Sequence, residues 1–165
     1  MVKFAFKYDG PIAIRYPRGE AYAKYKENRA KVVLGKCEEV FSGEKVLLFA
    51  IGSMFKNAIE VGKLMKEDMY QPTIVNARFA KPLDEEYLAK AAKDYSCIVT
   101  LEDNVYIGGV GERVNNILYK NGFKGDIINI SLPDEFVEHG SVDKLQKSLG
   151  MDPDSIYNRI KDTVQ

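Results

Sequence analysis

The strongest constraint on the fold is a run of six consecutive apolar residues, 46–51. A run of this length between turn residues is typical of a strand that is buried on both faces of a sheet. Gly52 and Ser53 follow it, and serine is a residue type that often caps the start of a helix. Apolar residues then recur at helical spacing to about Asp68, which predicts a helix directly after the strand.

The same order of strand and helix continues along the chain, with short connections. Further strands are predicted at residues 36–41, 72–76, 96–101 and 126–131, and helices near 82–92, at 110–120, after 141 and from 152. We expect residues 36–51 to form a hairpin-like pair and residues 102–111 to be a Gly-rich connection. The pattern predicts an α/β fold: a three-layer α/β/α sandwich with a mostly parallel, five-stranded mixed sheet and one antiparallel edge strand.

The formal net charge is zero, but the charges are unevenly distributed. Residues 1–35 (the head segment) hold eight basic and three acidic residues, a net charge of +5, and residues 36–165 carry −5. The head segment lacks a periodic apolar pattern and is predicted to be irregular, with a strand-like stretch at 12–14. The folded domain is expected to begin at residue 36.

Composition excludes several classes of protein. A balanced charge is unlike a general nucleic-acid binder, and no apolar run approaches the ~20 residues of a membrane helix. Cys37 and Cys97 match no metal or redox spacing. With no visible secretory signal, the two thiols suit a reducing, cytoplasmic location. His139 is the only histidine, so a multi-histidine metal site is excluded and a self-sufficient enzyme is disfavoured.

Two candidate sites lie at and after the end of the strand predicted at residues 96–101. Residues 108–111, Gly-Gly-Val-Gly, open a helix, where backbone N–H groups could meet a phosphate. The spacing matches neither common nucleotide motif, and Glu112 would repel an anion, so a tight packing turn is the favoured interpretation. Glu102 and Asp103 end the preceding strand, where α/β proteins often bind ligands. Neighbours on an extended strand point apart, which favours a structural role for both carboxylates.

Two further candidates lie toward the ends of the chain. His139, in a loop with several carboxylates, could be a general base, but a surface or interface role is favoured. Arg15 and Arg18 flank Pro17, which stiffens the backbone, and their guanidinium groups could bind a phosphate or carboxylate. A solvated basic linker is the equally weighted alternative for these arginines.

Four motifs, in order along the chain, carry a resemblance to a known family. They are residues 15–19 (RYPRG), 76–84 (NARFAKPLD), 100–103 (TLED) with 108–111, and 132–140 (LPDEFVEHG). Together they resemble the C-terminal part of the 1-deoxy-D-xylulose-5-phosphate synthase family, in the transketolase-like group of thiamine-diphosphate enzymes. The middle motifs are similar to the whole group, whereas the first and last resemble the synthases.

The resemblance implies an enzyme that condenses pyruvate with D-glyceraldehyde 3-phosphate to give 1-deoxy-D-xylulose 5-phosphate and CO₂. It implies that residues 1–35 are the tail of a preceding pyrimidine-binding domain and its linker, and that 36–165 are a transketolase C-terminal-like domain. Thiamine diphosphate and Mg²⁺ would be held by the other domains, the chain alone would be inactive, and a homodimer is expected.

One site residue follows from the resemblance: Arg18 is similar to the family arginine that binds the phosphate of glyceraldehyde 3-phosphate. Arg15 is left as structural, and His139 matches no catalytic histidine of the family. Two alternatives stay open. One is a stand-alone phosphate- or nucleotide-binding module that uses residues 108–111. The other is the C-terminal domain of a 2-oxoacid dehydrogenase β-subunit or of a transketolase.

Overall fold

The computed structural model describes residues 1–16, 22, 24 and 30–164. Its centre is one five-stranded sheet in the order β1-β3-β2-β4-β5. The strands are β1 (Glu38–Phe41), β2 (Val46–Ala50), β3 (Thr73–Asn76), β4 (Cys97–Val105) and β5 (Asp126–Leu132). β1 pairs antiparallel with β3, and every other pair is parallel.

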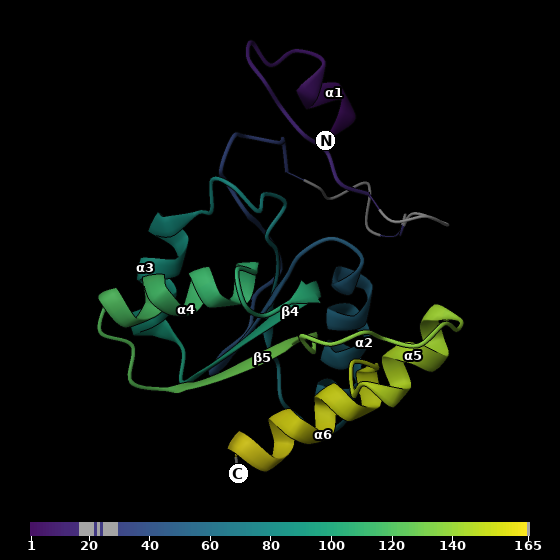
Figure 1. The fold of residues 1–165 in the computed structure, drawn as a ribbon. Coiled ribbons are helices and arrows are strands. Elements are labelled where there is room, and N and C mark those ends of the chain that lie inside the picture. The colour runs from purple at the N-terminus through teal and green to yellow at the C-terminus, as the bar shows by residue number, and fades with distance from the viewer. Residues whose placement is uncertain (17–21, 23, 25–29, 165) are drawn as a thin grey trace.

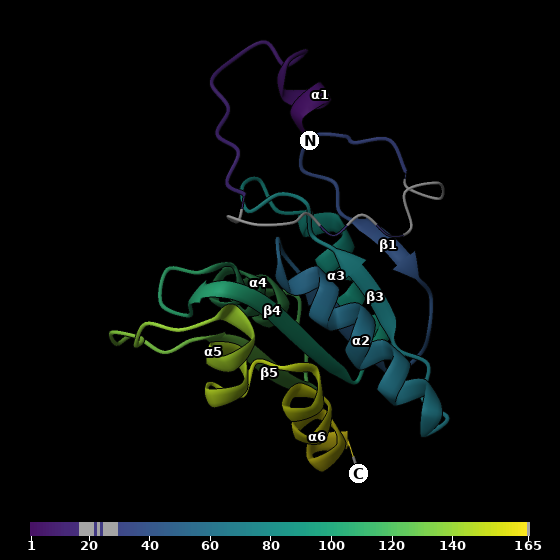
Figure 2. The same ribbon diagram turned by 90° about the vertical axis from the view of Figure 1, so that its right-hand side faces the viewer.

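Helices cover both faces of this sheet (Figures 1 and 2). One face packs against α2 (Met54–Glu67) and α6 (Pro153–Val164), and the other against α3 (Glu85–Asp94) and α4 (Val110–Lys120). The short helices α1 (Val2–Ala5) and α5 (Val142–Ser148) complete the described elements. The predicted three-layer sandwich with one antiparallel edge strand is therefore confirmed.

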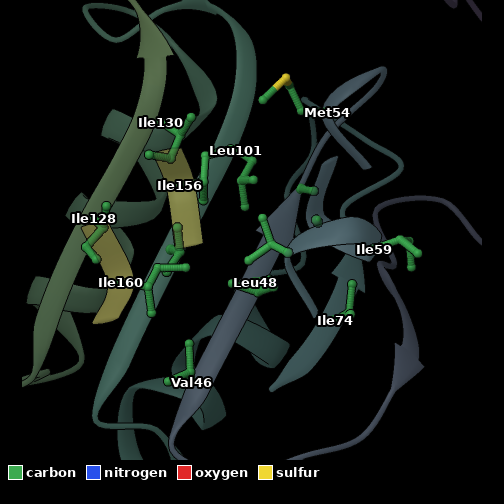
Figure 3. Close-up of a cluster of buried hydrophobic side chains, with 14 of the residues drawn as sticks. Val46, Leu48, Met54, Ile59, Ile74, Leu101, Ile128, Ile130, Ile156 and Ile160 are labelled. Carbon is green, nitrogen blue, oxygen red and sulfur yellow. The ribbon is translucent and has the colours of Figure 1, made fainter. Parts of the chain in front are cut away.

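The alternation of side chains along β2 explains the apolar run. Val46, Leu48 and Ala50 enter the core under α2 and α6, while Leu47 and Phe49 enter the core under α3 and α4. Figure 3 shows the first of these cores, in which side chains of α6 meet those of β4 and β5. Every residue of β2 is buried, because helices cover both faces of the strand.

The predicted hairpin was wrong in its pairing. β1 does not pair with β2: both edges of β2 are taken by its parallel partners β3 and β4. β1 instead closes the sheet on the outer side of β3, with Glu38 opposite Asn76. Adjacency in sequence suggested the hairpin, but the crossover through α2 places β3 between the two strands.

Three local predictions also differ from the structure. Residues 12–14, which are described, form no strand, and α1 was not predicted. β4 continues to Val105, so residues 102–105 belong to the sheet and not to the connection. Ser53 precedes α2, but its hydroxyl makes no bond to the helix N-terminus. In the described part of the chain, no helix is long and apolar enough to span a membrane.

Candidate functional site

The end of β4 places two carboxylates on opposite faces of the sheet. Glu102 is 2% exposed and accepts hydrogen bonds from the backbone N–H groups of Val110 (2.9 Å) and Gly111 (2.7 Å), at the start of α4. Asp103 points to the α2 side, where its Oδ2 accepts a bond from the Ser53 hydroxyl at 2.7 Å. Alternation along extended backbone explains this divergence, so the predicted separation of the two carboxylates is confirmed.

The Gly-rich turn before α4 is filled from within the protein. The N–H group of Gly108 donates to Glu112 at 2.6 Å, that of Gly109 to the Tyr106 carbonyl, and the next two to Glu102. Burial raises the pKa of Glu102, although the two N–H bonds oppose that rise. A phosphate at this turn would have to displace carboxylates that already hold its donors.

Close packing explains why glycine occupies this turn. A Cβ on Gly109 would overlap the carbonyl oxygen of Val105 and lie 2.7 Å from Glu102 Oε1. A Cβ on Gly111 would lie 2.9 Å from Thr100 Oγ1. The geometry thus supports the packing-turn interpretation and gives no support to the stand-alone nucleotide module.

The two carboxylates lie at the switch point of the sheet. From β2 the chain crosses through α2 to β3 on one side, and from β4 it crosses through α4 to β5 on the other. In doubly wound sheets, ligands usually bind in the crevice between two such strands. Here Glu102 lies at the start of α4 and Asp103 at the start of α2, so the crevice carries negative charge.

The described parts of the head segment, residues 1–16 and 30–35, lie over this edge of the sheet (Figure 2). Arg15 donates from Nη1 to Asp103 Oδ1 at 3.4 Å and from Nη2 to the Asp103 carbonyl oxygen at 3.3 Å. In α1, Phe4 packs edge-on against Phe79, with ring centroids 5.7 Å apart. Between the head segment and the sheet edge lies a cavity of about 650 Å³, lined by residues that include Ile12, Ile14, Ile51 and Ser53.

A second contact with the head segment is formed by a buried ion pair. Arg78 Nη2 lies 2.6 Å from Glu38 Oε1, and the two side chains are only 6% and 4% exposed. The Arg78 guanidinium also donates to the carbonyl oxygens of Ala30 (2.8 Å) and Lys31 (3.2 Å). The Ala30 N–H donates to Glu38 Oε1 at 2.7 Å. The pair therefore binds backbone atoms of the head segment and does not depend on its side chains.

Sequence reasoning missed this pair as a site. The available signal was a single arginine between Ala77 and Phe79, two residues after the end of a predicted strand. An acidic partner 40 positions earlier could not be identified from spacing. Arg78 also has a left-handed backbone, with φ of 59°, and its N–H donates to Asn76 Oδ1 at 3.1 Å.

The remaining candidate residues are placed as follows. Arg18 lies outside the described residues, whereas Arg15 makes the contacts given above. His139 is exposed in the loop between β5 and α5. Cys37 and Cys97 are free thiols, and burial raises their pKa values to about 12 and about 11, so both are protonated at neutral pH. Within the described ranges, no group of three or more His, Cys, Asp or Glu is arranged to hold a metal ion.

Thiamine diphosphate and Mg²⁺, which the resemblance implies, do not fit the switch-point crevice. A diphosphate there would face Glu102 and Asp103, and the N–H groups of residues 108–111 already have partners. The carboxylates themselves are engaged by N–H groups, Ser53 and Arg15. No catalytic step is therefore assigned to such a group on this chain.

These features define a doubly wound α/β domain in which the two switch-point carboxylates already have hydrogen-bond partners within the chain. The chain belongs to the family described as "Transketolase, C-terminal domain", and the model of that family matches residues 35–156.

Curated relatives are similar in sequence to this chain over nearly its whole length. It is 41% identical over 161 residues to a 1-deoxy-D-xylulose-5-phosphate synthase of Lachnoclostridium phytofermentans, a match that covers 97% of this chain and 26% of the relative. It is 35% identical over 155 residues to the synthase of Aquifex aeolicus, and this match covers 94% of this chain and 25% of the relative. The chain thus spans about a quarter of the length of these relatives.

Solved structures agree on the fold. A protein described as a split gene transketolase, inactive beta4 tetramer, has a TM-score of 0.86 and 23% identity, over 99% of this chain and 52% of that one. A transketolase variant from Pichia stipitis has a TM-score of 0.57 and 16% identity, over 79% of this chain and 18% of that one. At these identities the likeness concerns the fold alone.

Proposed function

We propose that this chain serves as the C-terminal domain of a 1-deoxy-D-xylulose-5-phosphate synthase. Such an enzyme is a thiamine-diphosphate-dependent transferase that condenses pyruvate with D-glyceraldehyde 3-phosphate and releases CO₂. Its product supplies isoprenoid, thiamine and pyridoxal biosynthesis. The observation that carries the proposal is the 41% identity over 97% of the chain, within a synthase about four times as long.

In this proposal the chain has a structural role and is inactive alone. Residues 1–35 are the tail of the pyrimidine-binding domain and its linker, and 36–165 form the C-terminal domain. The start of β1 at Glu38 and the family match from residue 35 support this division. The remaining domains hold thiamine diphosphate and Mg²⁺, and the enzyme is a cytoplasmic homodimer.

Arg18 is the proposed substrate-binding residue, through the phosphate of glyceraldehyde 3-phosphate. A guanidinium stays charged at all physiological pH values and donates two parallel bonds to phosphate oxygens. The support is its place in the RYPRG motif, three residues after Arg15.

A chimeric enzyme tests the proposed function. Residues 1–165 replace the matching part of the Lachnoclostridium synthase, and the same synthase truncated before that part is the control. With pyruvate, glyceraldehyde 3-phosphate, thiamine diphosphate and Mg²⁺, we expect the chimera to form 1-deoxy-D-xylulose 5-phosphate. The truncated enzyme and the 165-residue chain alone should not. A folded chimera that binds thiamine diphosphate but forms no product would contradict the proposal, and turnover by the chain alone would contradict its inactivity.

A further inference from the structure

The motif at residues 76–84 (NARFAKPLD) takes no part in the proposed function, yet three of its residues contact the same stretch of chain. That stretch is residues 30–37, the linker segment, which leads into β1. Arg78 contacts its beginning, Pro82 its middle and Asp84 its end. The motif therefore binds the linker segment at three successive places.

The first contact is made by a buried ion pair and reaches backbone atoms only. Arg78 donates to the carbonyl oxygens of Ala30 at 2.8 Å and Lys31 at 3.2 Å. Glu38, its ion-pair partner, accepts the Ala30 N–H at 2.7 Å. Asn76 accepts the Arg78 N–H at 3.1 Å, which supports the left-handed backbone of that arginine. The side chains of residues 30 and 31 take no part in these bonds.

The second contact is a turn packed against proline. The Lys36 N–H donates to the Val33 carbonyl oxygen at 3.1 Å, and Gly35 within this turn has a left-handed φ of 67°. A Cβ on Gly35 would lie 2.9 Å from Pro82 Cγ. Glycine thus serves both the backbone conformation and the close approach of the two segments.

The third contact joins the end of the linker segment to the start of α3. Asp84 accepts bonds from the Cys37 N–H and from the Lys36 ammonium, both at 3.1 Å. The same carboxylate caps α3, where it accepts the Tyr87 N–H at 3.2 Å. The backbone of the linker segment and the first turn of a helix therefore share one acceptor.

We propose that residues 76–84 and Glu38 form a binding surface for the linker segment, which they recognise by its backbone. The linker segment is then ordered as part of the C-terminal domain, although most of it precedes the boundary proposed at residue 36. Contacts at both of its ends fix the direction in which the chain enters β1. This inference concerns the 165-residue chain itself and does not rest on the proposed function.

Amide hydrogen exchange of the 165-residue chain, followed by NMR, tests the proposal. The amides of Ala30 and Cys37 each donate to a carboxylate. In wild type we expect them to exchange at least about tenfold more slowly than in an unstructured peptide, because bonds to charged groups are the stronger kind.

Two arginine variants form a matched pair. Arg78→Lys keeps a cation beside the buried Glu38 carboxylate but loses the planar fork, so exchange at Ala30 should become about tenfold faster. Arg113 in α4 donates to the Ala80 carbonyl oxygen of the same loop at 2.7 Å, a single bond that a lysine can also make. Arg113→Lys should therefore change exchange at Ala30 by less than about twofold.

Variants of the linker segment test recognition by the backbone. Ala30 is exposed, so its replacement leaves the core intact. Ala30→Pro removes the N–H that Glu38 accepts, whereas Ala30→Ser keeps it. Trypsin should cleave after Lys31 about tenfold faster in the proline variant than in the serine variant, since a bond to a charged group is lost. Lys31→Ala should leave exchange at Ala30 nearly unchanged.

Several outcomes would overturn the proposal. One is unprotected amides at Ala30 and Cys37 in wild type. Another is an Arg78→Lys variant in which Ala30 exchanges no faster than in Arg113→Lys, or in which the buried Leu48 amide of β2 accelerates by the same factor. Equal cleavage of the two Ala30 variants, or an effect of Lys31→Ala as large as that of Arg78→Lys, would show that recognition is not through the backbone. None of these measurements involves enzyme activity, so a failure of the proposed function is seen separately in the chimera.

Discussion

Replacement of Glu102 by alanine should destabilise the domain strongly. The Glu102 carboxylate is buried and accepts hydrogen bonds from the Val110 and Gly111 N–H groups at the start of α4. Glu102→Ala removes both acceptors and leaves the two N–H groups without a partner. It also removes the negative charge that the helix dipole favours at this end.

The size of the loss follows from those two bonds. A buried donor left unsatisfied costs about 1–3 kcal/mol, so two of them cost about 2–6 kcal/mol. Relief from burying a charge offsets part of this, and we expect a net loss of about 2–4 kcal/mol. For a domain of this size each kcal/mol lowers the Tm by about 2–4 °C, which gives a fall of roughly 4–16 °C. Glu102→Gln keeps one acceptor and should lie between wild type and Glu102→Ala.

Thermal and urea unfolding of the 165-residue chain measure this directly. Glu112→Ala is the matched control, because Glu112 accepts a bond from the Gly108 N–H of the same turn in an exposed position. Water can replace Glu112, so its loss should cost less than about 1 kcal/mol. The reasoning would be refuted if the two alanine variants had free energies of unfolding within about 0.5 kcal/mol of each other.

Two other predictions can be checked on the same 165-residue chain, and a third on the chimeric enzyme. Gly109→Ala should cost about 1–3 kcal/mol in urea unfolding, because its Cβ would overlap the Val105 carbonyl oxygen; unchanged stability would contradict the packing role of the turn. Burial acts to raise the pKa of Asp84, but bonds from the Lys36 ammonium and two backbone N–H groups outweigh it and lower the pKa below 3.8. This stabilisation is present above pH 3.8 and is lost as pH falls through the lowered pKa. Asp84→Asn should therefore lose less Tm than wild type between pH 5 and 2.5, and parallel curves would show that the carboxylate does not contribute. In the active chimera, Arg18→Ala should weaken acceptor binding by ~1.5–3 kcal/mol, seen as a higher KM for glyceraldehyde 3-phosphate; equal effects on pyruvate would contradict its proposed role.

Local patterns predicted most of the sheet and its helices. The apolar run at β2 and the helical spacing of α2 and α4 are signals that depend only on neighbouring residues. Long-range strand pairing could not be predicted in this way. β1 pairs with β3, although β2 and α2 lie between them in the sequence. The extension of β4 was missed because residues 102–105 are mostly polar. The strand can include Glu102 and Asp103 because these carboxylates accept hydrogen bonds at the starts of α4 and α2.

The candidate site was predicted less completely than the fold. Alternation of side chains correctly separated Glu102 from Asp103, but it could not show that each carboxylate lies at the start of a different helix. The ion pair of Arg78 and Glu38 depends on the meeting of two strands at the sheet edge. The proposed role of Arg18 rests on the resemblance alone, since this residue lies outside the described residues.

The internal carboxylates at the switch point have a consequence for ligand linkage. A ligand stabilises only the folded unit that binds it, by an amount that grows with its free concentration. Glu102 and Asp103 already accept hydrogen bonds from the backbone N–H groups, the Ser53 hydroxyl and the Arg15 guanidinium that the structure describes in the crevice. We therefore expect no anion to bind this domain there. In a multidomain enzyme its unfolding transition should stay at one temperature while added thiamine diphosphate raises the transition of the domains that bind the cofactor.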